Sequence, residues 1–280
     1  MERQINKLIK ISLLIRKKIF QTAIEAGSGH MASCFSCVDI LVAIYYSGVF
    51  RVNLKYRNQI TRDRFLLSKG HAALVLYAIL ADCGFFCSNK LRRFIKDGSS
   101  IGVHPDYGVP GVEFSSGSLG HSLSVAAGMA LAAKKDGKGY LCIVLLGDGE
   151  CHEGSVWEAA MFAAYQRLNN LIVIIDYNGL SATDFLKRYL DISPLGRKWE
   201  SFGWDTIAVN GHSFSELILA FKGLRERRSA NPLAIIAVTT KGKGVSFMEN
   251  SPIWHYRIPV GKELRIARQE LDLGNSHERI

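Results

Sequence analysis

Two apolar runs, each followed by a turn that carries an oxygen-bearing side chain, constrain the fold of this chain most strongly. Residues 141–146 are apolar and lead into a glycine-rich turn that contains Asp148, and residues 171–175 lead into a turn that contains Asn178. The amphipathic stretch between the two runs predicts a helix. Because the carboxyl ends of parallel strands face the same way, we expect Asp148 and Asn178 to lie side by side.

The same alternation of strands and helices continues along the chain. Further strands are predicted at 64–68, 204–209 and 233–238. Further helices are predicted at 5–25, 36–46, 72–81, 123–134, 194–202 and 213–227, the last with a capping box of Ser213 and Glu216. No repeat or low-complexity linker divides the sequence. It therefore predicts an α/β fold, a single doubly wound and mostly parallel sheet with helices on both faces.

Length and composition are those of one large α/β domain. The chain has 280 residues and is 48% hydrophobic, which argues against global disorder. No apolar run reaches the roughly 20 residues that a membrane helix needs, and the N-terminus lacks the pattern of a signal peptide. We therefore expect a cytoplasmic protein with no membrane partner. Its six cysteines should be buried, reduced thiols, although the CxxC spacing of Cys34 and Cys37 leaves a zinc or redox site open.

The net charge of +10 favours anionic partners such as phosphorylated metabolites or diphosphate cofactors. The basic residues are dispersed, with short clusters at 16–18 and 225–228. A nucleic-acid-binding surface is normally more concentrated, so we expect no nucleic-acid partner.

A long loop rich in Gly, Ser and Pro spans residues 98–120. Loops of this length in compact domains are usually functional. Gly117, Ser118 and Gly120 precede a predicted helix, where they offer backbone N–H groups with little steric bulk. The loop therefore predicts an anion-binding cradle.

Asp148 and Asn178 are hard oxygen ligands, and the backbone carbonyl of Leu180 offers a third. Magnesium held by three protein oxygens usually completes its shell with phosphate and water. Glycines at 147 and 149 allow close approach of an anion. The two turns together predict a metal ion bridged to a diphosphate, whereas the first turn alone is equally typical of an ordinary Asp-Gly turn.

The spacing of these turns, 28 residues between Gly149 and Asn178, resembles the thiamine-diphosphate-binding motif. Four further stretches resemble transketolase, and all occur in collinear order within residues 5–260. They are Leu67-Ser68-Lys69-Gly70-His71 and the segments 117–128, 149–160 and 241–250. The chain thus resembles the diphosphate-binding (PP) domain of a transketolase over residues 1–260, followed by a C-terminal tail at 261–280.

The resemblance implies a role for each matching residue. Asp148, Asn178 and the Leu180 carbonyl would hold Mg²⁺ or Ca²⁺. The residues that would bind thiamine diphosphate are His71, Gly117, Ser118, Leu119, His121, Gly149, Glu150, Asn178 and Lys241. The catalytic histidines would be His30, His71, His104 and His255. Glu153 and Glu158 would lie at a subunit interface.

The function implied is that of the N-terminal subunit of a two-chain transketolase, which transfers a two-carbon ketol unit from a ketose phosphate to an aldose phosphate. A C-terminal, pyrimidine-binding subunit would supply the activating glutamate in an α2β2 heterotetramer, so we expect the chain alone to be inactive. A specialised acceptor such as a nucleotide sugar, or a non-catalytic binding or regulatory role, are the alternatives. Met31-Ala32 follow His30 where transketolases usually have Pro-Gly, and without that proline we expect a looser loop.

Overall fold

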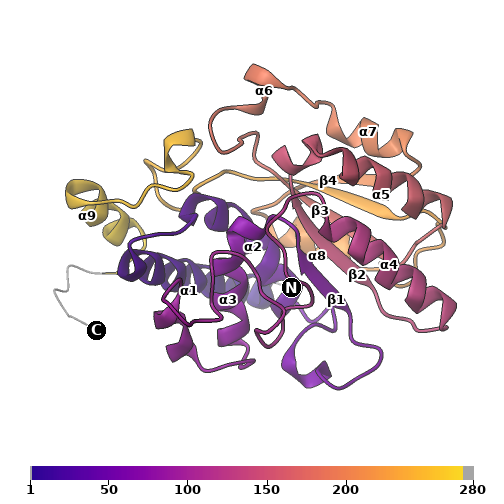
Figure 1. The fold of residues 1–280 in the computed structure, drawn as a ribbon, viewed down its shortest axis with the longest axis horizontal. Coiled ribbons are helices and arrows are strands. Elements are labelled where there is room, and N and C mark those ends of the chain that lie inside the picture. The colour runs from indigo at the N-terminus through magenta and orange to yellow at the C-terminus, as the bar shows by residue number, and fades with distance from the viewer. Residues whose placement is uncertain (1, 274–280) are drawn as a thin grey trace.

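One parallel five-stranded sheet forms the centre of the molecule (Figure 1). The computed structural model describes residues 2–273. The strand order is β1-β2-β3-β5-β4, and every neighbouring pair is parallel. The strands are β1 (Arg64–Leu67), β2 (Cys142–Gly147), β3 (Leu171–Tyr177), β4 (Asp205–Asn210) and β5 (Leu233–Val238). All five strands predicted from the sequence are present.

Helices cover both faces of this sheet, as the sequence predicts (Figure 1). They are α1 (Glu2–Ala26), α2 (Met31–Tyr46), α3 (Ala73–Asp82), α4 (Ser122–Lys135), α5 (Gly154–Tyr165), α6 (Leu186–Tyr189), α7 (Leu195–Ser201), α8 (Phe214–Phe221) and α9 (Gly261–Glu270). Successive residues of β2 enter different cores. Ile143 packs with residues of α1, α2, α3 and α8, whereas Val144 packs with residues of α4, α5 and α7. A strand buried on both faces is continuously apolar, which explains the runs in the sequence.

Several element bounds differ from those predicted by one or more residues, and for three of them the structure shows the physical reason. Helix α2 begins at Met31 instead of residue 36, because Met31 and Phe35 are fully buried. An ordered helix therefore follows His30 directly. Helix α8 ends at Phe221 instead of 227, since Lys222 is extended and Gly223 has a φ of 74°. The predicted strand at 204–209 begins one residue later, because Trp204 packs in the core beside α5 and α7.

The capping box of α8 is only half formed. Ser213 Oγ accepts a hydrogen bond from the Glu216 N–H at 3.4 Å, but the Glu216 carboxylate accepts from the Asn210 N–H instead of that of Ser213. Toward the C-terminus, α9 lies in the segment treated as a tail, and its Ala267 is buried. Residues 274–280, predicted to be frayed and including His277, lie outside the described part of the chain.

Among residues 2–273, no helix has the length and apolar character needed to cross a membrane.

A buried charge cluster joins α1, α2 and the turn after β4. Arg16 donates from both guanidinium Nη atoms to the Asp39 carboxylate, at 3.0 and 2.8 Å, and His212 Nδ1 lies 2.7 Å from Asp39 Oδ2. His212 Nε2 accepts from the Thr240 N–H, so its proton lies on Nδ1. Burial alone would raise the pKa of Asp39, but Arg16 and His212 lower it to about 2. This cluster gives His212 a structural role.

Asp39→Asn is expected to destabilise the chain at pH 7 by about 3 kcal/mol, because Arg16 would keep a buried charge without its counter-ion. The depressed pKa of Asp39 means that this contribution is present above about pH 4 and is lost as the pH falls toward 2. Urea unfolding of wild type and variant at pH 7 and pH 3 measures it, with the exposed Asp97→Asn as control. An equal difference at both pH values would contradict the assignment.

Candidate functional site

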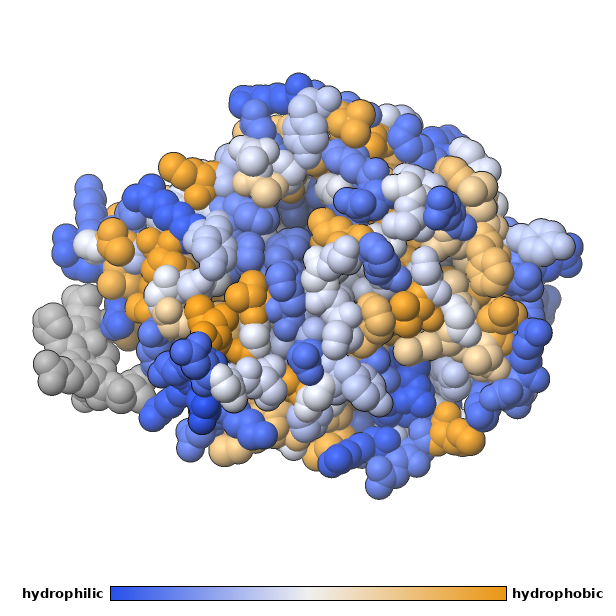
Figure 2. All heavy atoms as spheres, viewed as in Figure 1, coloured by the Kyte–Doolittle hydropathy of each residue, from blue (hydrophilic) through white to orange (hydrophobic). Residues whose placement is uncertain are grey.

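A cavity of about 320 Å³ lies beyond the carboxyl ends of β1, β2, β3 and β5. Figure 2 shows that this face of the molecule is hollowed near its centre, with hydrophilic residues in the hollow. The lining residues are Ser33, Lys69, His71, Gly117, Leu119, Gly147, Asp148, Gly149, Glu150, Asn178, Leu180, Ser181, Ala182, Lys241 and His255. The cavity therefore lies at the edge of the sheet where the sequence predicts a ligand site.

The turns that contain Asp148 and Asn178 lie side by side, as predicted. Gly147 is the register partner of Asp176, which places the next residues of both strands together. Asp148 is 2% exposed; its Oδ1 accepts from the Gly149 N–H at 2.8 Å and its Oδ2 from the Gly179 N–H at 2.5 Å. Its carboxylate thereby fixes both turns. Burial, with the nearby Asp176 charge, raises the pKa of Asp148 to about 6.

The oxygen atoms of this corner fit a hard divalent cation. Asn178 Oδ1 accepts a hydrogen bond from the Leu180 N–H at 3.1 Å. Leu180 also pairs with Phe185 in an isolated antiparallel bridge within the loop that follows β3. A buried carboxylate with a raised pKa is stabilised when a cation lies beside it, and Asp148, the Asn178 amide and the Leu180 carbonyl are all oxygen donors of the kind Mg²⁺ prefers. Residues 2–273 contain no group of three or more His, Cys, Asp or Glu placed to hold a metal ion. The oxygen set described here is of a different kind, since it has a single carboxylate.

Glycine is required where the loop after residue 115 meets the turn after β1. A Cβ on Gly70 would lie 2.9 Å from the Gly117 nitrogen, and a Cβ on Gly117 would lie 3.1 Å from His104 Cγ. The missing Cβ atoms allow the two segments to approach closely, and Gly117 and Leu119 line the cavity. Ser118 and His121, in contrast, are exposed and are not among the lining residues. The structure thus brings two of these four predicted cofactor-binding residues to the cavity.

Glu150 lines the cavity but is occupied by the protein itself. Its carboxylate accepts hydrogen bonds from Ser68 Oγ, from the Gly120 N–H at 2.8 Å and from the Gly147 N–H at 3.1 Å. Burial raises its pKa. Glu150 therefore links the ends of β1 and β2 to the glycine-rich loop.

Three of the four predicted catalytic histidines form one cluster. The ring centroids of His30 and His71 are 5.4 Å apart, and that of His255 lies 5.0 Å from His30 and 5.4 Å from His71. Burial lowers the pKa of all three, His30 to about 4 and His255 to about 3, with His104 and Lys241 respectively adding to the effect. These rings are therefore neutral at pH 7. His104 is exposed, and its ring lies against Gly117.

Lys241 fixes the orientation of His255. Its ammonium lies 2.6 Å from the Ser181 carbonyl and 2.9 Å from His255 Nδ1. An ammonium has no lone pair, so His255 Nδ1 is the acceptor and the ring proton lies on Nε2. Burial and the nearby Lys69 charge lower the pKa of Lys241 to about 8.

A family model described as "Transketolase, thiamine diphosphate binding domain" matches residues 10–276. The chain belongs to the transketolase family. It is 37% identical over 256 residues to one of the subunits of the apulose-4-phosphate transketolase of Phocaeicola vulgatus, an alignment that covers 91% of this chain and 90% of that protein. It is 40% identical over 248 residues to the transketolase of Homo sapiens, where it covers 86% of this chain and 38% of the human protein.

The solved structure of a transketolase from Campylobacter jejuni has the same fold, with a TM-score of 0.86 and 29% identity. The match covers 95% of this chain and 43% of the Campylobacter chain. The chain thus spans less than half the length of these two transketolases. The family and fold inferred from the sequence are confirmed.

The transketolase residues predicted at a subunit interface, Glu153 and Glu158, are both exposed. Glu158 lies on α5, on the same side as the exposed apolar residues Met161, Phe162 and Tyr165. Their spacing of three, four and seven residues places all four on one face of the helix. The structure shows that this face has no covering partner within residues 2–273.

The sequence interpretation missed the buried ion pair at the base of the candidate site. Lys69 and Asp176 form a salt bridge with side-chain exposures of 2% and 0%. Ser36 and Thr239 also donate to the Asp176 carboxylate. Lys69 lies between Ser68 and the Gly70-His71 turn. Its position just after the predicted strand at 64–68 was the sequence signal that could have identified it as a site residue. Ser33, Ser181 and Ala182 also line the cavity without having been predicted.

Proposed function

We propose that this chain binds the diphosphate and divalent metal of thiamine diphosphate and acts as the N-terminal subunit of a two-chain transketolase. The observation that supports this most directly is the pairing of Asp148 and Asn178 on adjacent turns, with Leu180, at a cavity that also holds His71 and His255. Membership of the family makes thiamine diphosphate the natural ligand of this arrangement.

The residues of the chain have separable tasks in this proposal. Asp148, Asn178 and the Leu180 carbonyl hold the metal, while Gly117 and Gly149 leave room for the diphosphate. When bound, thiamine diphosphate supplies a nucleophilic carbon and an electron sink for the two-carbon unit. The neutral rings of His30, His71 and His255 can donate hydrogen bonds to sugar hydroxyl groups or accept hydrogen bonds from them. They can also transfer the hydroxyl protons. His255, with its proton on Nε2, is a donor at that atom.

A second kind of chain completes the site in this proposal. Glu150 is the only glutamate among the described residues that line the cavity, and three donors of the protein occupy its oxygens. It is therefore unavailable to activate the cofactor's aminopyrimidine. The Phocaeicola relative, of nearly the same length, is named as one subunit of a transketolase. We infer that a C-terminal, pyrimidine-binding chain supplies the activating glutamate, in an α2β2 assembly.

Calorimetric titration of the lone chain with thiamine diphosphate tests the binding half of the proposal. Binding should require Mg²⁺ or Ca²⁺ and disappear when EDTA removes the metal, because both phosphates and the buried Asp148 are negative. Equal affinity with and without metal would overturn the metal assignment. Acceptor aldoses, with and without phosphate, and nucleotide sugars can then be compared in the reconstituted complex, where activity with a nucleotide sugar alone would favour the specialised acceptor.

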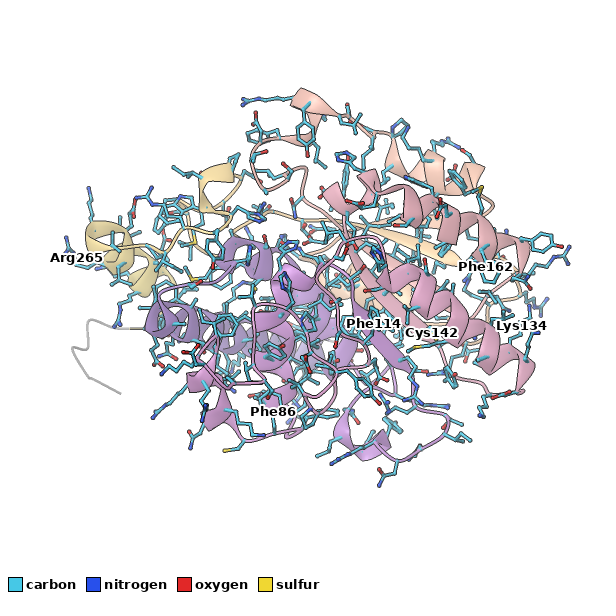
Figure 3. All side chains as sticks on the ribbon, viewed as in Figure 1. Phe86, Phe114, Lys134, Cys142, Phe162 and Arg265 are labelled. Carbon is cyan, nitrogen blue, oxygen red and sulfur yellow. The ribbon has the colours of Figure 1, made fainter. Side chains whose placement is uncertain are left out.

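The exposed face of α5 supports the proposed interface. Phe162 and Tyr165, 42% and 84% exposed, are large apolar groups on the outer side of this helix, where Figure 3 labels Phe162. Phe162→Asp with Tyr165→Ser should weaken association with the second chain or second copy by about 30-fold, since large aromatic groups dominate binding energies at interfaces. Analytical ultracentrifugation measures this association. Leu219→Asp is the matched control, because it places the same charge on a 72% exposed apolar residue of another helix, α8. Equal effects of both variants would contradict the assignment.

A further inference from the structure

A second cavity lies at the opposite edge of the sheet, where the strands begin. Its volume is about 460 Å³. Four separate segments form it: the loop before β1, the α4–β2 connection, the α5–β3 connection and the α8–β5 connection. The lining residues are Arg51, Lys134, Lys138, Gly139, Tyr140, Leu141, Asn169, Asn170, Leu224, Arg225 and Arg227. Five of these are basic and none is acidic; we call this cavity the basic pocket.

Asp63 holds the walls of the basic pocket in place from behind. It is fully buried, accepts from the Leu141 and Arg51 N–H groups at 2.8 Å each, and pairs with Arg225 Nη2 at 2.5 Å. Arg225 Nη1 also donates to the Gly139 carbonyl at 3.1 Å. Three of the four segments are therefore tied to one another, so the pocket has a defined shape.

The aspartates that pair with the lining residues do not balance all the positive charge of the basic pocket. Arg225, Arg227 and Lys138 each pair with one aspartate, namely Asp63, Asp205 and Asp136. Two cations remain. Within residues 2–273, the side chain of Arg51 has no hydrogen bond or ion pair, and Lys134 donates only to the neutral carbonyls of Gln166 and Arg167.

One donor of the basic pocket is buried and has no partner. Arg227 donates through Nη2 to Asp205 and to the Asn231 carbonyl, but its Nη1 is buried without an acceptor among the described residues. A buried donor that is left unpaired is costly. Basic residues do gather at this edge because helices end there and expose carbonyls. That accounts for Lys134, which caps α5, but it does not account for Arg51 or Arg227.

We propose that the basic pocket binds a small phosphate-bearing anion. Arginine side chains match the oxygens of a phosphate through paired donors, and Arg51 and Arg227 bring such groups to the pocket. Lys138, whose carboxylate partner Asp136 is partly exposed, adds an ammonium group that can turn to the anion. The volume accommodates a phosphorylated metabolite. The basic pocket is separate from the candidate cofactor cavity. The two cavities lie at opposite ends of the strands, and the six residues of β2 span about 20 Å at about 3.3 Å per residue. It is independent of the proposed function.

The test titrates inorganic phosphate into the chain at constant ionic strength, followed by backbone NMR shifts. Wild type should show shifts at Gly139 to Leu141 and at 224–227. Arg51→Ala/Lys138→Ala should weaken this binding by about tenfold or more, since it removes two charge-assisted contacts. Lys7→Ala/Lys10→Ala removes the same charge from exposed positions of α1 and should change the affinity less than about twofold.

Two further readings complete the test. Asn178→Ala, at the other edge, should leave the phosphate shifts of the basic pocket unchanged, which separates them from phosphate bound at the cofactor cavity. Thermal unfolding should be nearly the same for the pocket variant and wild type. The Arg51 side chain has no partner to lose among residues 2–273, and the Lys138–Asp136 pair is partly exposed and contributes little. Absence of phosphate shifts in the basic pocket of the wild type, or equal weakening by both double variants, would overturn the proposal.

Discussion

Asp148→Asn is expected to weaken binding of Mg²⁺ and thiamine diphosphate by about a hundredfold or more, because the metal loses its only charged protein ligand. The same change should alter the stability of the metal-free chain by less than about 1 kcal/mol. Removing a buried charge whose pKa is raised to about 6 is favourable, whereas the asparagine NH₂ group faces one of the N–H donors of Gly149 and Gly179, which is unfavourable.

Calorimetric titration and urea unfolding on the same preparations separate these two effects. The exposed Asp97→Asn removes the same charge elsewhere and should change neither quantity. Near-normal cofactor affinity in Asp148→Asn would refute the metal assignment. A large loss of stability together with lost binding would instead show that Asp148 acts by holding the two turns.

Asp176→Asn is expected to destabilise the chain by about 3–5 kcal/mol, because it leaves the Lys69 ammonium buried without a counter-charge. Burial alone would lower the pKa of Lys69, but Asp176 raises it above its ordinary value, so Lys69 is charged at pH 7. The double change Lys69→Met/Asp176→Asn should recover part of the loss, since no unpaired charge remains.

Urea unfolding at pH 7 measures the effect of breaking the Lys69–Asp176 pair. Asp136→Asn provides the matched control, because the Lys138–Asp136 pair is partly exposed and should contribute less than about 1 kcal/mol. A loss for Asp176→Asn as small as that of the control would contradict the account of this pair.

The parts of the site that follow directly from strand ends could be predicted from the sequence. Asp148 and Asn178 each lie in the turn that follows an apolar run, and the parallel register places the turns after neighbouring strands together. Likewise, His71 follows β1 and Lys241 follows β5, and both line the cavity. Local pattern and sheet topology were sufficient for these residues.

Other parts depended on contacts between distant segments, which no local pattern reveals. Lys69 and Asp176 are 107 positions apart, and only the fold shows that they pair. The hydrogen bonds that occupy Glu150 come from three separate segments. The start of α2 at Met31 was missed because its first turn is buried, so it lacks the polar and apolar alternation that marks an exposed helix.

The basic pocket illustrates the same limit. Along the sequence, Arg51 and Lys138 lie far from each other and from the short basic cluster at 225–228, and this dispersion argued only against a nucleic-acid surface. The fold gathers them because the connections at the amino ends of neighbouring strands lie next to one another. Basic residues that are dispersed along the sequence can therefore form a dense cluster of charge in the folded chain.

Ketol transfer measured for the purified chain alone and for the chain mixed with its pyrimidine-binding partner, each with thiamine diphosphate and Mg²⁺, tests the central claim most directly. We predict no turnover by the lone chain and full activity in the mixture, with activity lost from the mixture when Asp148→Asn replaces the wild-type chain. Full activity of the lone chain, or an active mixture containing Asp148→Asn, would contradict the account.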